Sequence, residues 1–452
     1  MRERRLPSKS TAAANVFTSP KLRLGAKARA AEWYPYYAGY RLAFVTDVLR
    51  YLELPAGAHI IDPWAGSGTT GAAGIRSGCR VSGFDLNPAL VLIAKARGVG
   101  SGVVGSIHPL AIELLDHARA DNTAGATNDG LNVWFQPQTA EYLRRLERAV
   151  FAVLVKPSDQ RLLFDDLGIL DSVSSLAALY YVALFRTVRH FLRDFKSSNP
   201  TWIKAPVAAE ARLGIEREAI NGLFITTVDA LATQVRLNPS VMNEDACQVQ
   251  LSDSRRLPVS DGVADACIAS PPYCTRIDYV VGSLPELAII GCPNAATARS
   301  IRDAMLGTPT MSAKTPEPQR NWGKTCREFL EYVRGHNSHA SEGYYWRNYL
   351  QYFDGLYASF AEINRVLSDR GKCVLVVQDS HYKGRQLDLG TIVAEMAVEM
   401  KWRLRKRVEY GCHTIASINR GARQYGSSGR ATESVIVLER KRMTSRTRTL
   451  NG

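Results

Sequence analysis

The sequence predicts an α/β protein with a seven-stranded, mostly parallel sheet that helices cover on both faces. Three observations support this fold class. Short apolar runs bounded by turn residues alternate with helical patterns. A glycine-rich turn follows the first of these runs directly. The stretch 98–245 contains no such run and reads as helical, so we expect a large helical insertion between the second and third strands.

The seven expected strands are residues 59–62, 80–85, 248–252, 264–269, 372–378, 402–410 and 434–440. Helical patterns fall between them, for example over 90–97 and 350–367. Only a loop separates the last two strands. We therefore expect these two to pair as an antiparallel hairpin at the edge of the sheet.

The α/β domain is expected in two parts, residues 31–97 and residues 246–440. Between them lies the mostly helical insertion, 98–245, which is long enough to fold as a subdomain. Residues 292–345 are rich in Pro, Gly, Ser and Asn, which predicts a long loop insertion. The basic ends, 1–30 and 441–452, have the composition of disordered tails.

Composition narrows the partners. The 452 residues include 57 Lys and Arg against 43 Asp and Glu, a net charge of +14 that suits a polyanion such as nucleic acid. No apolar run approaches ~18 residues, and the basic start has no apolar core of a signal peptide. We therefore expect a cytoplasmic protein without membrane contact. The eight cysteines form no CxxC or Cys/His cluster, so neither a disulfide framework nor a metal site is indicated.

A candidate cofactor site begins at DPWAGSGTTG, residues 62–71. Gly66, Gly68 and Gly71 satisfy G-x-G-x-x-G, a pattern in which small residues let the backbone approach a ligand where a helix starts. The next strand ends in Asp85, where an acid can accept hydrogen bonds from ribose hydroxyls. The pattern fits a nicotinamide dinucleotide or S-adenosylmethionine. A tight turn without a ligand is the alternative.

A rigid corner ends the strand 264–269. Its residues, Ser270-Pro271-Pro272-Tyr273, are named the SPPY corner here. Proline lacks a backbone N–H and disfavours helix at the residue before it, so the corner has a fixed, extended backbone. The Ser270 hydroxyl and the Pro271 carbonyl are suitable acceptors for the two N–H groups of an amine, and Tyr273 offers a face on which a base can stack. The alternative is a strand-ending turn with a core tyrosine.

DPWAGSGTTG, GFDLNP and SPPY together resemble the DNA amino-methyltransferases, whose motifs read roughly DPFxGSGTT and (S/N/D)PPY. SPPY resembles most the branch that methylates cytosine N4. The resemblance covers about 33–98 and 248–380, with a weaker match at 434–440. Two features depart from the family pattern: the glycine motif precedes SPPY, the reverse of many N4-cytosine enzymes, and the helical insertion interrupts the sheet. The place of target recognition, the insertion or 292–345 or both, is therefore left open.

The resemblance implies a Rossmann-like class I methyltransferase fold and methyl transfer from S-adenosylmethionine to a flipped base in double-stranded DNA, without a metal. It favours cytosine N4 as the target and suggests a restriction endonuclease or defence-system partner. Adenine N6 in DNA, guanine N2 in RNA and a protein glutamine amide are alternative targets. A DNA-binding protein that kept the fold without turnover is an alternative from another class.

Three sets of candidate site residues follow. The cofactor set is Asp62, Pro63, Trp64, Gly66, Ser67, Gly68, Thr69, Asp85, Leu86, Asn87, Asp253 and, from the upstream segment 33–49, Tyr37 and Tyr40. The catalytic set is Ser270, Pro271, Pro272 and Tyr273. The DNA-binding set is Arg276, Asp278 and Tyr279. Basic stretches with aromatic residues at 320–336, 344–353 and 401–413 are further candidates for phosphate contacts, with an edge strand as the alternative for the last.

Overall fold

The structure is a computed structural model. It describes residues 16–21, 33–36, 39–123, 128–156, 162–195, 197, 202–237, 246–274, 278–312, 315–338, 340–413 and 430–440. Two candidate residues, Tyr37 and Arg276, lie outside these ranges, as do the tail 441–452 and most of 1–30.

All seven expected strands form one sheet. They are β1 (His59–Asp62), β2 (Arg80–Asp85), β3 (Cys247–Leu251), β4 (Ala264–Ala269), β5 (Leu367–Gln378), β8 (Trp402–His413) and β9 (Arg430–Arg440). Their order is β3-β2-β1-β4-β5-β9-β8, with β1 to β5 parallel and β9 antiparallel to both of its neighbours. This is the predicted Rossmann-like class I fold. The expected hairpin of the last two strands is confirmed.

Helices cover both faces of the sheet, and the strands alternate between two apolar cores. Ile60 and Val374 pack with α2 (Leu42–Leu52) on one face. Ile61 and Leu375 pack on the other face, which carries α12 (Trp346–Val366) and α13 (Leu389–Glu399). Because both faces are buried, these strands read as continuous apolar runs.

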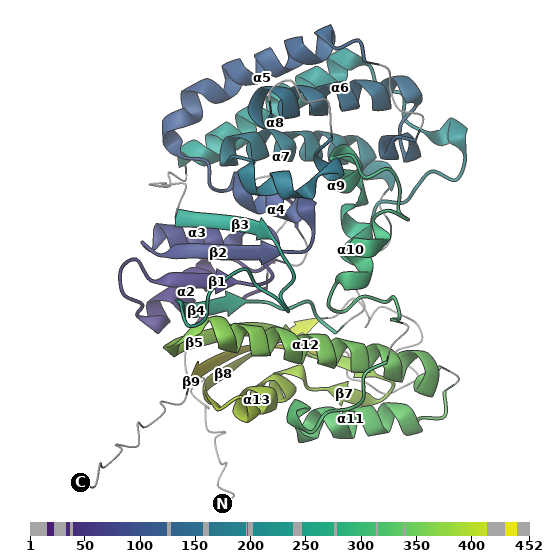
Figure 1. Ribbon diagram of the computed structural model, residues 1–452. Coiled ribbons are helices and arrows are strands. Elements are labelled where there is room, and N and C mark those ends of the chain that lie inside the picture. The colour runs from purple at the N-terminus through teal and green to yellow at the C-terminus, as the bar shows by residue number, and fades with distance from the viewer. Residues whose placement is uncertain are drawn as a thin grey trace, which may run out of the picture.

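The helical insertion forms a layer beyond the β3 edge of the sheet (Figure 1). Its helices are α5 (Val104–Ala120), α6 (Pro137–Leu154), α7 (Ser175–Phe191) and α8 (Arg217–Leu237). They do not have a core of their own, because α4 (Pro88–Ala96) and α9 (Leu284–Ile289) belong to the same apolar cluster. The insertion and the α/β domain therefore share one hydrophobic core at the place where they meet.

Local signals explain where these helices begin. Asn87 caps α4 by accepting the N–H of Ala89 at 3.0 Å, and a proline takes the first helical position, where no N–H is needed. Ser174 caps α7 in the same way, accepting the N–H of Ala177 at 3.1 Å. The chain thus passes from β2 to the insertion through α4, a helix whose first residue is fixed by the Asn87 cap and by Pro88.

The prediction of a long loop over 292–345 is only partly correct. This stretch contains α10 (Arg299–Ala304), α11 (Lys324–Gly335) and a π-helical turn, Ser341–Tyr345, that leads into α12. In α11 the buried side chains are Cys326, Phe329, Leu330 and Val333. This apolar stripe has helical spacing, but polar residues around it dominate the composition. A short hairpin of β6 (Ser380–Tyr382) and β7 (Arg385–Leu387) was also not expected.

The described part of the chain contains no single helix long and apolar enough to cross a membrane. The pair Pro88–Ala96 and Ser101–Ala120, bent by 81°, passes a test of length and composition only when taken together.

The remaining α-helix of the sheet domain is α3 (Thr69–Arg76), which starts at the glycine turn.

Candidate functional site

A pocket of about 880 Å³, open to solvent at its mouth, lies at the carboxyl ends of β1, β2 and β4. In parallel sheets this edge is where ligands bind. The sequence-predicted residues that line it are Tyr40, Pro63, Trp64, Gly66, Ser67, Thr69, Asp85, Leu86, Asp253, Ser270, Pro271, Pro272, Tyr273 and Tyr279. The glycine turn and the SPPY corner, far apart in sequence, therefore meet in one pocket.

Asp85 holds the glycine turn. One carboxylate oxygen accepts the N–H of Gly66 at 3.0 Å, and the other accepts the N–H of Asn87 at 2.9 Å. Gly66 has a φ of 52°, and a Cβ there would lie 3.1 Å from the Tyr36 ring, so a larger residue would be strained and crowded. Loss of water raises the pKa of Asp85 to about 6, although the backbone N–H groups oppose the shift.

Three predicted cofactor residues support the pocket without lining it. Asp62 accepts the N–H of Trp64 at 3.1 Å and the hydroxyl of Tyr40 at 3.2 Å. Gly68 has a φ of 77°, and a Cβ there would meet the α4 backbone at 2.8 Å. Asn87 caps α4. In the structure these three residues hold the turn and the start of α4, and their direct contact with the cofactor stays a prediction.

Asp278, predicted to touch DNA, is also displaced from the pocket. Its side chain is 3% exposed, accepts the N–H of Val281 at 3.0 Å and forms an ion pair with Arg302 of α10. A buried carboxylate with these partners holds the backbone after the SPPY corner. Tyr279, next in sequence, is the residue of this set that lines the pocket.

Aromatic cover for the pocket comes from Tyr36 and Tyr40. Of the two tyrosines expected there, Tyr40 lines the pocket and Tyr37 lies outside the described residues. Burial raises the pKa of both described phenols well above the usual value, so they stay protonated. Four tyrosines within seven positions gave no signal for which of them would point inward, and Tyr36 was missed for that reason.

Asp253 lies on the pocket wall, but its carboxylate is engaged. It accepts the backbone N–H of Arg255 and the Nε–H of the same residue, both at 2.9 Å. The guanidinium of Arg255 also donates to the carbonyl of Ala304 at 2.8 Å. Arg255 was not predicted from the sequence and lines the pocket together with Met305 and Leu306.

The hydrogen bonds of the SPPY corner involve the Ser270 hydroxyl and the carbonyl of Pro272. The Ser270 hydroxyl donates to the carbonyl of Val376 at 3.0 Å. The carbonyl of Pro272 accepts the hydroxyl of Tyr352 at 3.0 Å, whereas no described residue donates to the carbonyl of Pro271. The Ser270 oxygen and the Pro271 carbonyl therefore remain able to accept hydrogen bonds from a ligand.

Tyr273 is fixed by a residue that the sequence did not reveal. Its hydroxyl donates to Oε1 of Glu433 on β9 at 3.0 Å. Burial raises the pKa of Tyr273 well above its usual value, which keeps this proton on the phenol. Glu433 precedes the apolar run SVIVL, and an acid at the start of a buried strand was the signal that could have identified it.

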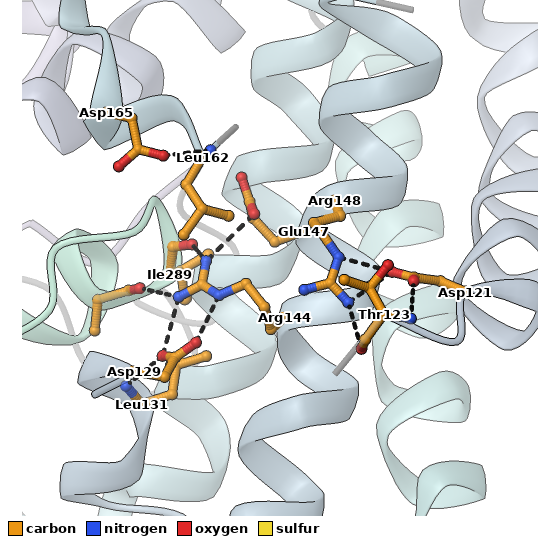
Figure 2. A network of polar contacts seen from close by, with 11 residues as sticks. Asp121, Thr123, Asp129, Leu131, Arg144, Glu147, Arg148, Leu162, Asp165 and Ile289 are labelled. Atoms are coloured by element: carbon orange, nitrogen blue, oxygen red, sulfur yellow. Dashed lines mark hydrogen bonds and ion pairs between the residues drawn. The ribbon is translucent and has the colours of Figure 1, made fainter. Parts of the chain in front are cut away.

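The insertion forms hydrogen bonds with α9, the helix that follows the SPPY corner. Figure 2 shows Arg144 of α6 at the centre of a buried network with Asp129 and Glu147. Its guanidinium also donates to the carbonyls of Ala288 and Ile289 at the end of α9, the first of which accepts the N–H of Gly291 as well. With 3% of Arg144 exposed, this contact is a structural clamp on α9.

A second arginine of the insertion binds the same segment. Arg189 of α7 donates to the carbonyl of Gly282 and pairs with Glu286, a side chain that is 1% exposed. The Tyr34 hydroxyl donates to the same carboxylate. Three distant parts of the chain, 33–34, α7 and α9, are thus joined beside the pocket.

Many aromatic residues of the three basic stretches are core residues. Trp322, Tyr349 and Phe353 are 0%, 4% and 0% exposed, and they pack inside the cluster around α12. Their burial explains the aromatic residues of these stretches as packing residues, whereas the expected phosphate contacts of the basic residues stay a prediction. The strand at 402–410 is the edge strand β8, as its alternative interpretation held.

No family model and no curated protein matches the chain. Two solved structures of geranyl diphosphate methyltransferase, one in complex with GPP and sinefungin and one in complex with SAM, are similar at 10% identity and a TM-score of 0.29. The matches cover 89% of this chain, and 81% and 88% of those chains. An identity of 10% and a TM-score of 0.29 do not indicate a cofactor or a substrate, and the fold class follows from the strand order of the sheet. Within the described ranges, no group of three His, Cys, Asp or Glu side chains could hold a metal ion.

Proposed function

We propose that the protein transfers a methyl group from S-adenosylmethionine to the exocyclic amino group of a base in DNA, with cytosine N4 as the first target to test. One observation carries this proposal: the glycine turn with its acid and the acceptor pair of the SPPY corner line the same pocket. A pocket that held only a nucleotide cofactor would not need Ser270 and Pro271 at its wall.

The residues present fit S-adenosylmethionine. Gly66 and Ser67 allow close approach of backbone to ligand, and Asp85 is placed to accept hydrogen bonds from ribose hydroxyls. Trp64 and Leu86 add apolar surface beside them. When bound, S-adenosylmethionine supplies a sulfonium methyl group for in-line displacement.

The proposed role of the SPPY corner is to make the exocyclic amino group of the base a better nucleophile. The lone pair of an exocyclic amine is delocalised into the base ring. Acceptors at Ser270 and Pro271 draw its two N–H groups out of the ring plane and so free the lone pair. The rigid prolines fix the direction of both acceptors, so that catalysis consists mainly of orientation and electrostatics.

Tyr273 and Tyr279 supply the aromatic surface for the base. Both line the pocket, and the hydroxyl of Tyr273 is held by Glu433. A base inside a duplex must leave the stack to reach such a pocket, and stacking on an aromatic ring offsets part of that cost. Double-stranded DNA is therefore the substrate that the proposal names.

Mass spectrometry of nucleosides tests the proposal. Unmethylated DNA of varied sequence is incubated with the protein and isotope-labelled S-adenosylmethionine, then digested. Labelled N4-methylcytosine is the expected product. Labelled N6-methyladenine would keep the chemistry and change the target base. No labelled nucleoside in DNA would overturn the DNA assignment, and RNA would then be tested for N2-methylguanine.

A further inference from the structure

Glu433 lies directly behind the SPPY corner, in the part of β9 that pairs with the end of β5. Glu433 is buried, with 5% of the residue exposed, and its Oε1 accepts a hydrogen bond from the hydroxyl of Tyr273 at 3.0 Å. No described residue hydrogen-bonds to Oε2. Burying a carboxyl group with so few partners is costly. The phenol of Tyr273 is thus the principal partner of Glu433, so a role of Glu433 in the pocket would act through Tyr273.

The hydrogen bonds of the corner have a direction. Ser270 has a single hydroxyl proton, which it donates to the carbonyl of Val376 at 3.0 Å, while the oxygen of Tyr273 lies 3.4 Å away. Because Tyr273 gives its own proton to Glu433, it can only accept from Ser270. The lone pairs of the Ser270 oxygen are then left for a ligand.

We propose that Glu433 is a positioning residue that sets this direction, so that Ser270 accepts hydrogen bonds from the target group and does not donate to it. The inference deepens the proposed function and rests on it. A corner with this polarity selects an amino group, which donates, over a base carbonyl, which accepts. Without Glu433, the phenol proton of Tyr273 turns to Ser270 and occupies a lone pair that the amine requires.

The test is a set of four variants assayed for single-turnover methylation of unmethylated plasmid DNA with isotope-labelled S-adenosylmethionine. Glu433→Ala should slow transfer by about 10- to 100-fold, the range for losing one hydrogen bond to a polar or charged group. Glu433→Gln keeps an acceptor oxygen for Tyr273 and should lie near wild type. Tyr273→Phe keeps the ring and should also retain most activity, since Ser270 still donates to Val376.

The double variant Glu433→Ala/Tyr273→Phe is decisive. Removal of the misdirected phenol proton should restore the rate of Tyr273→Phe, so that the second substitution rescues the first. A merely structural role for Glu433 predicts no rescue. Glu439→Ala, an acid on the same strand whose side chain is 29% exposed, is the matched control and should leave the rate unchanged.

The two proposals fail in different ways. A wild-type protein that labels no nucleoside would overturn the proposed function and this inference together. An active wild type with an unimpaired Glu433→Ala variant, or with a double variant as slow as Glu433→Ala, would overturn this inference alone. If Glu433→Ala does not fold, Glu433→Leu, which fills the volume, takes its place in the same comparison.

Discussion

At the scale of single residues, Asp85 links the backbone of the glycine turn to the proposed cofactor. Its two oxygens already accept N–H groups of Gly66 and Asn87, yet the residue lines the pocket. A carboxylate has enough lone pairs to accept further bonds from ribose hydroxyls. The residue ties the glycine turn to the start of α4, and its role in binding the cofactor is a prediction that variants can test.

Replacing Asp85 with Ala should weaken binding of S-adenosylmethionine by about 1–3 kcal/mol, the range for hydrogen bonds to a charged group. Isothermal titration calorimetry measures the dissociation constant directly. Asp253→Ala is a useful comparison, because that carboxylate is already paired with Arg255. An unchanged constant in the folded Asp85→Ala variant would remove Asp85 from the cofactor site.

Cofactor binding should also depend on pH through Asp85. Its pKa is raised to about 6 in the protein, and ribose hydroxyls bond better to the charged carboxylate than to the acid. Affinity should therefore rise as pH increases through about 6 and level off above it. Titrations between about pH 5 and pH 8, a range that brackets the raised pKa, give the profile.

The control for this profile is Asp85→Asn, which should bind with little pH dependence. Burial raises the pKa of Asp62 to about 6 as well, but Asp62 does not line the pocket. A pH dependence that persists in Asp85→Asn would assign the titration to Asp62 instead.

Tyr273 should be required for methyl transfer and dispensable for cofactor binding. Tyr273→Ala removes the ring on which the base stacks, so we expect transfer to be lost while S-adenosylmethionine binds nearly as in wild type. Labelled-nucleoside formation and calorimetry measure the two properties. Loss of cofactor binding in a folded variant would place the ring at the cofactor and contradict its assignment to the base.

At the scale of elements, the helical insertion acts as a clamp. Arg144 on α6 and Arg189 on α7 both bind the backbone around α9, the helix that follows the SPPY corner. The insertion also shares its apolar core with α4, which starts just after Asp85. The two halves of the pocket are thus held by the same helical layer, a role that its helical composition alone did not indicate.

Substituting Arg144 with Met should destabilise the protein by about 3–5 kcal/mol, because the buried carboxylates of Asp129 and Glu147 would lose their cation. Denaturant unfolding followed by circular dichroism measures the change. The matched control is Arg119→Met, whose side chain is 57% exposed, with an expected effect of about 0–1 kcal/mol. Equal stability of the two variants would show that the clamp does not stabilise the fold.

At the scale of the whole molecule, the positive charge is unevenly distributed along the chain. Residues 1–30 carry 8 Lys and Arg against 1 Asp or Glu, and residues 441–452 carry 4 against none. The helical insertion, 98–245, carries 14 against 17. The net charge of +14 therefore comes mainly from the two ends of the sequence, and the insertion lacks the charge of a phosphate-binding surface.

Removing residues 441–452 should weaken DNA binding and make it less sensitive to salt, because each cation that contacts a phosphate releases a counterion. Fluorescence anisotropy with a labelled duplex at several salt concentrations gives the slope. The matched control replaces four exposed cations of the insertion with Gln: Arg119, Arg193, Lys204 and Arg236. A change of slope in the control but not in the truncation would move DNA binding to the insertion.

Much of the fold was predictable because the sheet is buried on both faces. The central parallel strands are apolar because both of their faces are buried, and β1, β2 and β4 were placed with their observed ends. Glycine and proline fix local backbone geometry, so the turn at Gly66 and the corner at Pro271 were also evident. The sequence by itself determined the fold class and the two motifs of the pocket.

Only the tertiary structure decided which other residues complete the pocket. Tyr36 and Arg255 line it, and Glu433 on β9 holds the hydroxyl of the lining residue Tyr273; these contacts depend on the packing of distant elements. The same holds for Arg144 and its clamp on α9. Local patterns record the preferences of neighbouring residues, whereas a hydrogen bond between residues 160 positions apart depends on how the whole sheet brings its strands together.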